Sequence, residues 1–237
     1  HVFSSQYFTE AISTALEEED HTDRDQSLHT TYALVMSINR SVPGLLLNVI
    51  PQLADQVTSD DVSLRMLAVT TLGRMFGEAP SKLAGNASGE GSLARTYPDA
   101  WRAWVGRHAD KVAQIRVVWV ENLRGILIHH PLLVPEVAAL MEVKLQDPDE
   151  KVRAAVARLI GSLDYESALH STPTSLLKEL GGRCRDKRAS VRAESMAALG
   201  KLFDLAYPQI EAHDTAATEH FGWIPKVVLD VLRGIGT

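Results

Sequence analysis

The sequence predicts an all-α protein in which antiparallel helix pairs stack into a solenoid. One phrase recurs: an aspartate, four residues, an aliphatic residue and an arginine. It occurs at Asp110 to Arg116, at Asp147 to Arg153 and at Asp186 to Arg192, with a cruder copy at Leu64-Arg65. The aliphatic positions lie 51, 37 and 39 residues apart. Periods of roughly 40 to 47 residues are typical of HEAT and armadillo arrays, whose helix pairs bury their apolar faces against neighbouring repeats. We therefore expect a HEAT-repeat α-solenoid.

Apolar spacing of helical type identifies the expected helices in chain order. It runs through residues 3–16, 34–38 and 46–53, and strand-like alternation is missing. Breaks are expected near residues 19–25, 58–61, 131 and 171–173. The clearest second helix of a repeat carries one apolar stripe, formed by Val152, Val156, Leu159, Ile160 and Leu163. The last expected helix is apolar through Ile224, Val227, Val228, Val231 and Leu232.

The start of the helix at Val152 has a predicted cap. Asp147 precedes Pro148, which suits the first helical position, and Glu150 would complete a capping box. The aspartate and arginine of the repeated phrase thus have a structural explanation. The aspartate would cap its helix, and the arginine would pair with the aspartate of a neighbouring repeat.

We expect residues 1–237 to form a single HEAT-repeat array, a piece of a longer solenoid. The segment 78–96 is different, because it is rich in Gly, Ala, Ser and Asn and has no apolar periodicity. It is expected to be a flexible surface insertion. Its glycines, Gly85, Gly89 and Gly91, lack the following Lys-Ser/Thr and the preceding strand of a phosphate-binding loop.

Composition limits the classes of function. The chain has a formal net charge of −6 and an apolar content of 45%, so it can bury a large core but has no global basic field for nucleic acid. Its single cysteine, Cys184, excludes an intrachain disulfide, and no apolar run approaches the ~20 residues of a membrane span. A reducing compartment, cytosol or nucleus, fits these features.

Signs of catalysis are missing from the sequence. The adjacent pair His129-His130 would point about 100° apart on a helix, and Cys184 is its only possible sulfur partner in the chain. No Gly-x-Ser-x-Gly turn or comparable nucleophile context is present. We therefore expect a non-enzymatic protein with no catalytic residue, no metal and no cofactor.

The distribution of charge is more informative than its sum. Acidic residues gather at residues 17–25, whereas Lys178 to Lys201 is basic. The basic run is either a solvated face or a groove for an acidic peptide or a small polyanion. In the same region, Met196 and Gly200 have two explanations. They either take part in ordinary helix packing or form a shallow surface on which a peptide binds closely.

Several runs together resemble a known family. They are the Leu-Leu-x-x-Val-x-Pro-Gln-Leu pattern at 45–53, Trp101 with Gly106-Arg107, the segment from Asn122 to His130-Pro131, and Asp147-Pro148-Asp149-Glu150; later runs are Asp186-Lys187-Arg188, Val191-Arg192 with Glu194 and Met196, and Trp223-Ile224. The chain resembles the precocious dissociation of sisters family, HEAT-repeat regulators of cohesin. The longer insertion at 78–96 and Pro225 after Trp223-Ile224 depart from the family's animal members, so a fungal member is expected.

The resemblance implies a scaffold in the nucleus, associated with chromosomes. It would bind the kleisin subunit of cohesin, cooperate with the wings-apart-like releasing factor and support the cohesin acetyltransferase, and so contact chromatin indirectly. We expect the kleisin segment to lie on Arg188, Arg192, Met196 and Gly200. The arginines would attract acidic residues, Met196 would give adaptable apolar contact and Gly200 would permit close approach. Met196→Lys is then expected to abolish kleisin binding.

Two alternatives remain from the residues alone. A HEAT-like DNA glycosylase would use a concave helical surface with Trp, Asp and Arg, and the chain has Trp101, Trp104 and Trp119. The acidic balance and the core-like spacing of these tryptophans oppose it. A generic HEAT adaptor, such as a transport receptor, shares the fold and differs only in the specific runs quoted above.

Overall fold

The computed structural model describes residues 2–17, 21–41, 49–79 and 92–234. These residues form helices and connecting turns, without a strand among them, which confirms the predicted all-α class. None of their helices is long and apolar enough to span a membrane. The chain divides into two compact units, His1–Asn122 and Leu123–Thr237, and each is described by itself. A single array over residues 1–237 stays a prediction.

Unit 1 consists of helices that pack in pairs. Helix α1 packs on α2, α2 on α4, and α4 on α7, while α3 packs on both α4 and α6. In chain order the elements are α1 (Val2–Glu17), α2 (His21–Ser41), α3 (Ile50–Gln56), α4 (Val62–Gly77), α5 (Leu93–Thr96), α6 (Pro98–Val105), the 3-10 helix η2 (Gly106–Ala109) and α7 (Ala113–Glu121).

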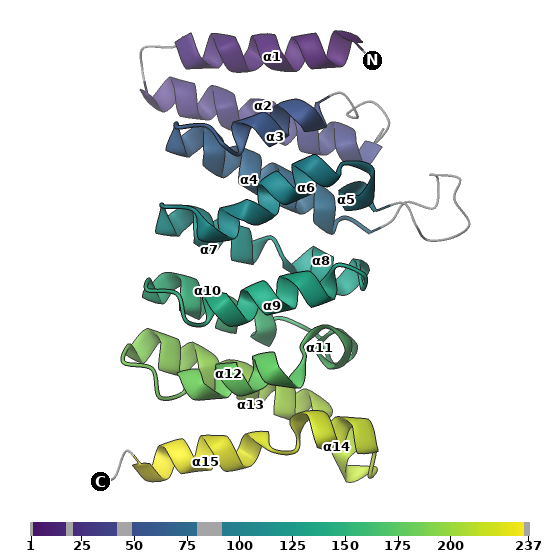
Figure 1. The fold of residues 1–237 in the computed structure, drawn as a ribbon, viewed down its shortest axis with the longest axis vertical. Coiled ribbons are helices and arrows are strands. Elements are labelled where there is room, and N and C mark those ends of the chain that lie inside the picture. Colours follow the sequence, from purple (N-terminus) through teal and green to yellow (C-terminus); the bar gives the residue numbers. More distant parts are fainter. Residues whose placement is uncertain (1, 18–20, 42–48, 80–91, 235–237) are drawn as a thin grey trace, which may run out of the picture. The chain divides into compact units, whose positions relative to one another are not determined.

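Unit 2 is also built from helices that pack on one another. Its second-layer helices α10 and α13 lie side by side, and α9 and α12 form the layer in front of them in Figure 1. The elements are α8 (Arg124–His129), α9 (Val134–Lys144), α10 (Glu150–Gly161), α11 (Tyr165–Ser171), α12 (Thr174–Arg183), α13 (Ala189–Glu211), α14 (Thr215–Phe221) and α15 (Ile224–Gly234).

The predicted breaks at residues 58–61 and 131 fall between helices, and the break at 171–173 does so from residue 172 onwards, because α11 ends at Ser171. The predicted break at residues 19–25 is wrong over its described part, because α2 begins at His21. The predicted insertion at 78–96 falls mostly on residues 80–91, which lie outside the described residues. Its last residues are not irregular as expected, because Leu93–Thr96 form α5, capped by the Ser92 hydroxyl. Much of the acidic run at 17–25 also lies outside the described side chains.

The core of unit 1 contains an aromatic cluster that explains the spacing of its tryptophans. Trp101, Trp104 and Trp119 are buried, and the Trp104 and Trp119 ring centroids are 5.7 Å apart. The Trp104 indole donates a hydrogen bond to the Val69 carbonyl oxygen, and Phe76 contacts Trp101 and Trp104 edge-on. These rings therefore hold helices together and have no free face on which a nucleic-acid base could stack.

Candidate partner-binding surface

The repeated phrase forms a buried ion pair between successive repeats. In unit 2, Arg153 on α10 donates from Nε and Nη2 to the two carboxylate oxygens of Asp186, at 2.9 Å each. In unit 1, Arg65 on α4 pairs with Asp110 in the same way, with an Nε–Oδ2 distance of 3.0 Å. All four side chains are buried. The predicted pairing of each arginine with the aspartate of a neighbouring repeat is confirmed for these pairs.

The arginine of the phrase also binds the loop that precedes its own helix. The Nη1 of Arg153 donates to the Asp147 carbonyl oxygen at 2.7 Å, and that of Arg192 donates to the Asp186 carbonyl oxygen at 2.9 Å. Arg116 does the same with Asp110. The guanidinium groups of Arg65 and Arg153 therefore each bridge two loops. One loop precedes the arginine's own helix, and the other belongs to the following repeat. Its planar array of donors suits this bridging role.

The aspartate of the phrase is not the helix cap that the sequence predicted. The Asp147 carboxylate accepts the backbone N–H of Asp149 through Oδ1 and the Lys144 ammonium through Oδ2. Helix α10 begins two residues later than expected, at Glu150, and Asp149 caps it by accepting the N–H of Lys151. The predicted capping box at Asp147 is therefore wrong. Both aspartates suit a turn, and the one nearer the first helical residue makes the cap.

These contacts change the acid–base behaviour of the pair. Burial alone would raise the pKa of Asp186, but hydrogen bonds from Arg153 and from the Arg188 backbone N–H hold that pKa below its ordinary value. The hydrogen bond to Asp186 raises the pKa of Arg153 above its ordinary value despite the opposing effect of burial. Both groups stay charged at neutral pH, so the pair is permanent rather than switchable.

A glycine eight residues after each of two arginines allows close packing on the next repeat. A Cβ placed on Gly161 would lie 3.0 Å from both Cα and Cβ of Ala198 on α13. A Cβ placed on Gly73, in unit 1, would lie 2.6 Å from the Cβ of Asn122. Such distances leave no room for a side chain, so each glycine fixes how near the following helix comes.

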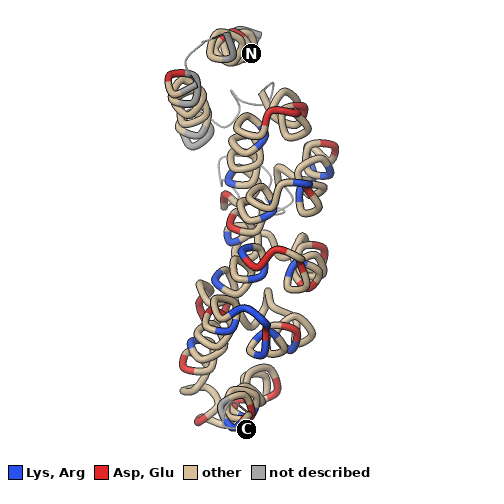
Figure 2. Tube along the Cα trace, turned by 90° about the vertical axis from the view of Figure 1, so that its left-hand side faces the viewer, with Lys and Arg blue, Asp and Glu red and all other residues tan. Residues whose placement is uncertain are grey.

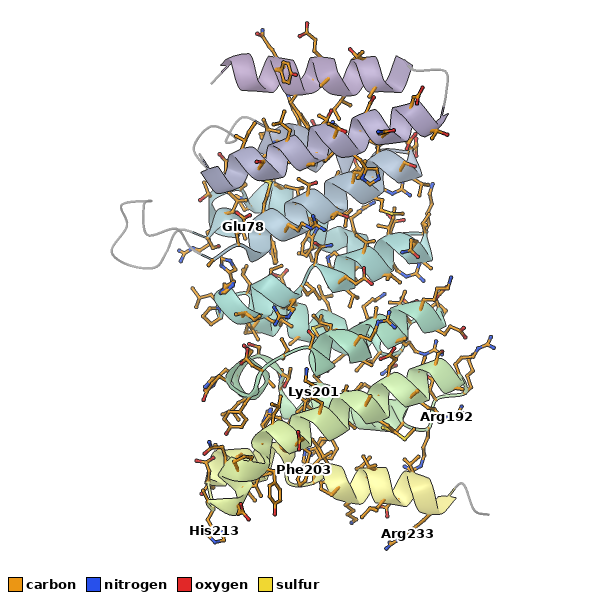
Figure 3. The ribbon with its side chains drawn as sticks, turned by 180° about the vertical axis from the view of Figure 1, so that it is seen from behind. Glu78, Arg192, Lys201, Phe203, His213 and Arg233 are labelled. Carbon is orange, nitrogen blue, oxygen red and sulfur yellow. The ribbon has the colours of Figure 1, made fainter. Side chains whose placement is uncertain are left out.

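The four predicted partner contacts belong to α13 or, for Arg188, to the N-cap position just before it. Arg188 is exposed and forms an ion pair with Glu150, with 2.6 Å between its Nε and the Oε2 of Glu150. Arg192 and Met196 are half-buried, and Gly200 is exposed with no atom within 4 Å of a Cβ placed on it. In Figure 3, Arg192 lies near one end of α13, with Lys201 and Phe203 further along the helix. Their role as kleisin contacts stays a prediction.

A cleft between two loops was not anticipated from the sequence. It has a volume of about 370 Å³ and lies where the α9–α10 loop meets the α12–α13 loop. In Figure 2 the first loop carries acidic positions and the second carries basic ones. The cleft is lined by Gln146, Asp147, Pro148, Arg153, Gly182, Arg183, Arg185, Asp186 and Lys187.

The charge at this cleft is carried by two exposed side chains. Arg153 is neutralised by Asp186, and Arg183 contacts both Asp186 and Glu179. Arg185 and Lys187 are exposed and form no ion pair with a described residue. The basic run in the sequence contained this signal, but only the fold separates the two available cations from those already paired. The arrangement can hold an anion at the rim of the cleft.

Comparison with known proteins identifies the family. Residues 3–234 match the family model for the sister chromatid cohesion protein PDS5. The pds5 protein of Schizosaccharomyces pombe is 28% identical over 229 residues, which are 95% of this chain and 18% of that protein. The chicken PDS5 homolog B is 30% identical over 207 residues, which are 87% of this chain and 14% of that protein. This chain therefore spans less than a fifth of the length of these curated relatives.

A solved structure supports the same assignment at the level of the fold. The structure described as the Pds5–Scc1 complex contains a chain that superimposes with a TM-score of 0.80 at 19% sequence identity. The match covers 94% of this chain and 32% of that one. The family match extends from α1 to α15 and so includes both units. The chain belongs to the sister chromatid cohesion protein PDS5 family.

Proposed function

We propose that this chain is part of a non-enzymatic, chromosome-associated scaffold that regulates cohesin by binding its kleisin subunit. The family match over residues 3–234 carries this proposal. The likeness in fold to a chain of the Pds5–Scc1 complex supports it, since that protein is named for its complex with Scc1. The scaffold would also recruit the wings-apart-like releasing factor and the cohesin acetyltransferase, and so act in sister chromatid cohesion within the nucleus.

The rim of the loop cleft is the proposed contact for acidic residues of the kleisin segment. Arg185 and Lys187 are exposed and have no carboxylate partner in the described chain, so an incoming carboxylate breaks no existing pair. Arg188 adjoins them, and its pair with Glu150 is solvent-exposed and therefore weak. An acidic peptide can replace Glu150 at little cost. Charge of this kind mainly sets association rate and specificity.

The test is a titration of the full-length protein with a fluorescently labelled kleisin segment at increasing salt. The double variant Arg185→Glu/Lys187→Glu is expected to weaken binding, and the loss should be largest at low salt because both sites are exposed. Lys178→Glu is the matched control, since Lys178 is an exposed lysine on α12 that does not line the cleft. Equal affinity of all three proteins would contradict the proposed contact, and no binding to the wild-type protein would contradict the proposed function.

The same two cations make a small polyanion a second candidate ligand for the cleft. Phosphate groups favour clustered arginine and lysine side chains, and the cleft has room for a compact ligand. A competition experiment between the labelled kleisin segment and sodium tripolyphosphate distinguishes these two candidate ligands of the cleft. Displacement of the labelled kleisin segment by tripolyphosphate would mean that both use Arg185 and Lys187, whereas simultaneous binding would assign the cleft to the polyanion and the peptide to another surface.

Duplex DNA of matching label serves to test the glycosylase alternative. The buried positions of Trp101, Trp104 and Trp119 remove the aromatic surface that base stacking would need. We expect no salt-sensitive DNA binding by this chain. Tight binding that falls steeply with salt would contradict the scaffold proposal.

A further inference from the structure

Ser190 lies in the first turn of α13, directly after the basic residues at the rim of the loop cleft. Lys187 and Arg188 stand three and two residues before it, and they are the only two basic residues that are adjacent in the chain. The side chains of Lys187, Arg188 and Ser190 are all exposed. The Ser190 hydroxyl has no hydrogen-bond partner in the described part of the chain. This oxygen is therefore accessible and is not used by the fold.

A basic pair at this spacing is the feature that one class of Ser/Thr protein kinases selects. Such kinases bind an extended substrate and place their own carboxylates against cations two and three residues before the acceptor serine. The backbone at Arg188 is already extended, with φ −98° and ψ 128°. Only Ala189 and Ser190 need to leave the helix, and the N–H groups of a first turn have no partner within the helix. Because helix ends fray, Ser190 can reach a kinase while buried Val191 stays in place.

Two other serines show that the basic pair and the exposure coincide at Ser190. Ser63 in α4 takes the same place, two residues before the arginine of the repeated phrase, but it follows the two aspartates Asp60 and Asp61. Ser195 in α13 has an arginine three residues before it, but its side chain is fully buried. Neither serine suits a kinase that selects basic residues. They are natural controls for Ser190.

We propose that Ser190 is a phosphorylation site for a Ser/Thr kinase that selects basic residues, and that its phosphate weakens the binding of an acidic kleisin segment at the loop cleft. The second part rests on the proposed function. The kinase supplies ATP with Mg²⁺. A bond forms between Ser190 Oγ and the γ-phosphorus, and the bond from that phosphorus to the bridging oxygen of ADP breaks. ADP leaves, and the hydroxyl proton passes to a carboxylate of the kinase.

A phosphate at position 190 changes the charge at the rim of the cleft. It carries a charge of about −1.5 to −2 at neutral pH, and it adjoins Arg185, Lys187 and Arg188 in the sequence. Roughly half of their combined positive charge or more is thereby offset. Arg188 can turn to the phosphate because its pair with Glu150 is exposed and weak. The phosphate thus competes, within the same chain, with the carboxylates of the kleisin segment.

The same phosphate suits the start of α13. This helix has no side-chain cap at Arg188 and no acidic residue in its first turn, whereas α4, α10, α11 and α14 each begin with an aspartate cap. An anion on the second helical residue lies near the unpaired N–H groups and the positive end of the helix dipole. Glu194, four residues further on, opposes it weakly, because Arg158 already pairs with Glu194. Phosphorylation therefore orders the first turn.

The first experiment tests the site. The full-length folded protein is incubated with ATP, Mg²⁺ and the catalytic subunit of cyclic-AMP-dependent protein kinase, and mass spectrometry locates the phosphate. We expect phosphate at Ser190 and none at Ser63 or Ser195. The double variant Lys187→Ala/Arg188→Ala should slow phosphorylation at least about tenfold, because two charge-assisted contacts to the kinase are lost. Absence of phosphate at Ser190, or an unchanged rate in the double variant, would overturn the site.

The second experiment tests the consequence. Phosphorylated and untreated proteins are titrated with the labelled kleisin segment at low salt, and phosphorylation should weaken binding roughly three- to tenfold. Ser190→Ala, treated with kinase in the same way, should bind like the untreated protein. Unchanged affinity of the phosphorylated wild type would overturn the regulatory step.

A readout that does not involve kleisin separates the two proposals. Hydrogen exchange of the backbone amides at residues 190–193 should slow about two- to fivefold on phosphorylation, because the phosphate stabilises the first turn of α13. Unchanged exchange would contradict the predicted contact of the phosphate with the helix start. Failure of the untreated protein to bind kleisin would overturn the proposed function and the regulatory step with it, whereas mass spectrometry and hydrogen exchange would still decide whether Ser190 is a site.

Discussion

Helices α10 and α13 each carry an arginine with a glycine eight residues after it, and yet these two positions have different surroundings in the two helices. Arg153 and Gly161 are in contact with the following repeat, through Asp186 and Ala198, whereas Arg192 and Gly200 have no such contacts in the described chain. The sequence pattern thus determines what each position is able to contact. Whether the contact stabilises the protein depends on the next layer. Substitutions at matched positions should therefore have different effects in the two helices, and this contrast can be measured.

The largest difference is expected at the two arginines. Arg153→Ala removes both hydrogen bonds to Asp186 and leaves that carboxylate buried, so it should cost about 3–5 kcal/mol. Arg192→Ala removes one hydrogen bond at a half-buried site and should cost about 1 kcal/mol in the 237-residue chain. Urea denaturation followed by circular dichroism measures both. Similar losses in free energy of unfolding would show that the buried pair has no special role.

Acid should weaken the α10 contact in a defined pH range. The folded-state pKa of Asp186 lies below its ordinary value of 3.8, so the unfolded chain binds the proton more tightly. The stabilisation is therefore fully present above about pH 4 and is lost as the pH falls through the folded-state pKa. The measurement is the free energy of unfolding of wild type and Asp186→Asn between pH 6 and 2. The variant should lack this part of the acid dependence, and identical curves would argue against it.

Close packing at the glycines should give the next largest contrast. Gly161→Leu places a side chain where Cα and Cβ of Ala198 lie 3.0 Å from the first added carbon, so we expect a loss of about 1–3 kcal/mol. Gly200→Leu meets open space in the 237-residue chain and should not destabilise it. Thermal unfolding of the two variants compares them directly. A larger loss for Gly200→Leu would mean that α13 is already covered.

The helix starts provide a smaller effect that separates two neighbouring aspartates. Asp149→Ala removes the cap of α10 and should cost about 1 kcal/mol. Asp147→Ala should cost more, because it leaves the buried Lys144 ammonium without its carboxylate. Chemical denaturation of the two single variants establishes the order. The reverse order would restore Asp147 as the cap.

The helical class and the arginine–aspartate pairing were predictable from the sequence, because both depend on repeated spacing. The cap of α10 was not, because Asp147 and Asp149 suit a turn equally well and only the backbone path chooses between them. The loop cleft was also beyond prediction, since Gln146 and Arg185 come from different repeats. The glycine eight residues after Arg65, Arg153 and Arg192 was visible in the sequence. Its meaning required knowing what each glycine faces.

The smallest expected effect distinguishes an empty face from an occupied one. Gly200→Ala should stabilise the 237-residue chain by about 0.5–1 kcal/mol, because alanine restricts the unfolded backbone and its Cβ meets no atom within 4 Å. Gly161→Ala should instead destabilise the chain, because its Cβ would lie 3.0 Å from both Cα and Cβ of Ala198. Differential scanning calorimetry of the two variants gives both values. Stabilisation by both substitutions would show that the close approach of α13 to Gly161 has no energetic cost.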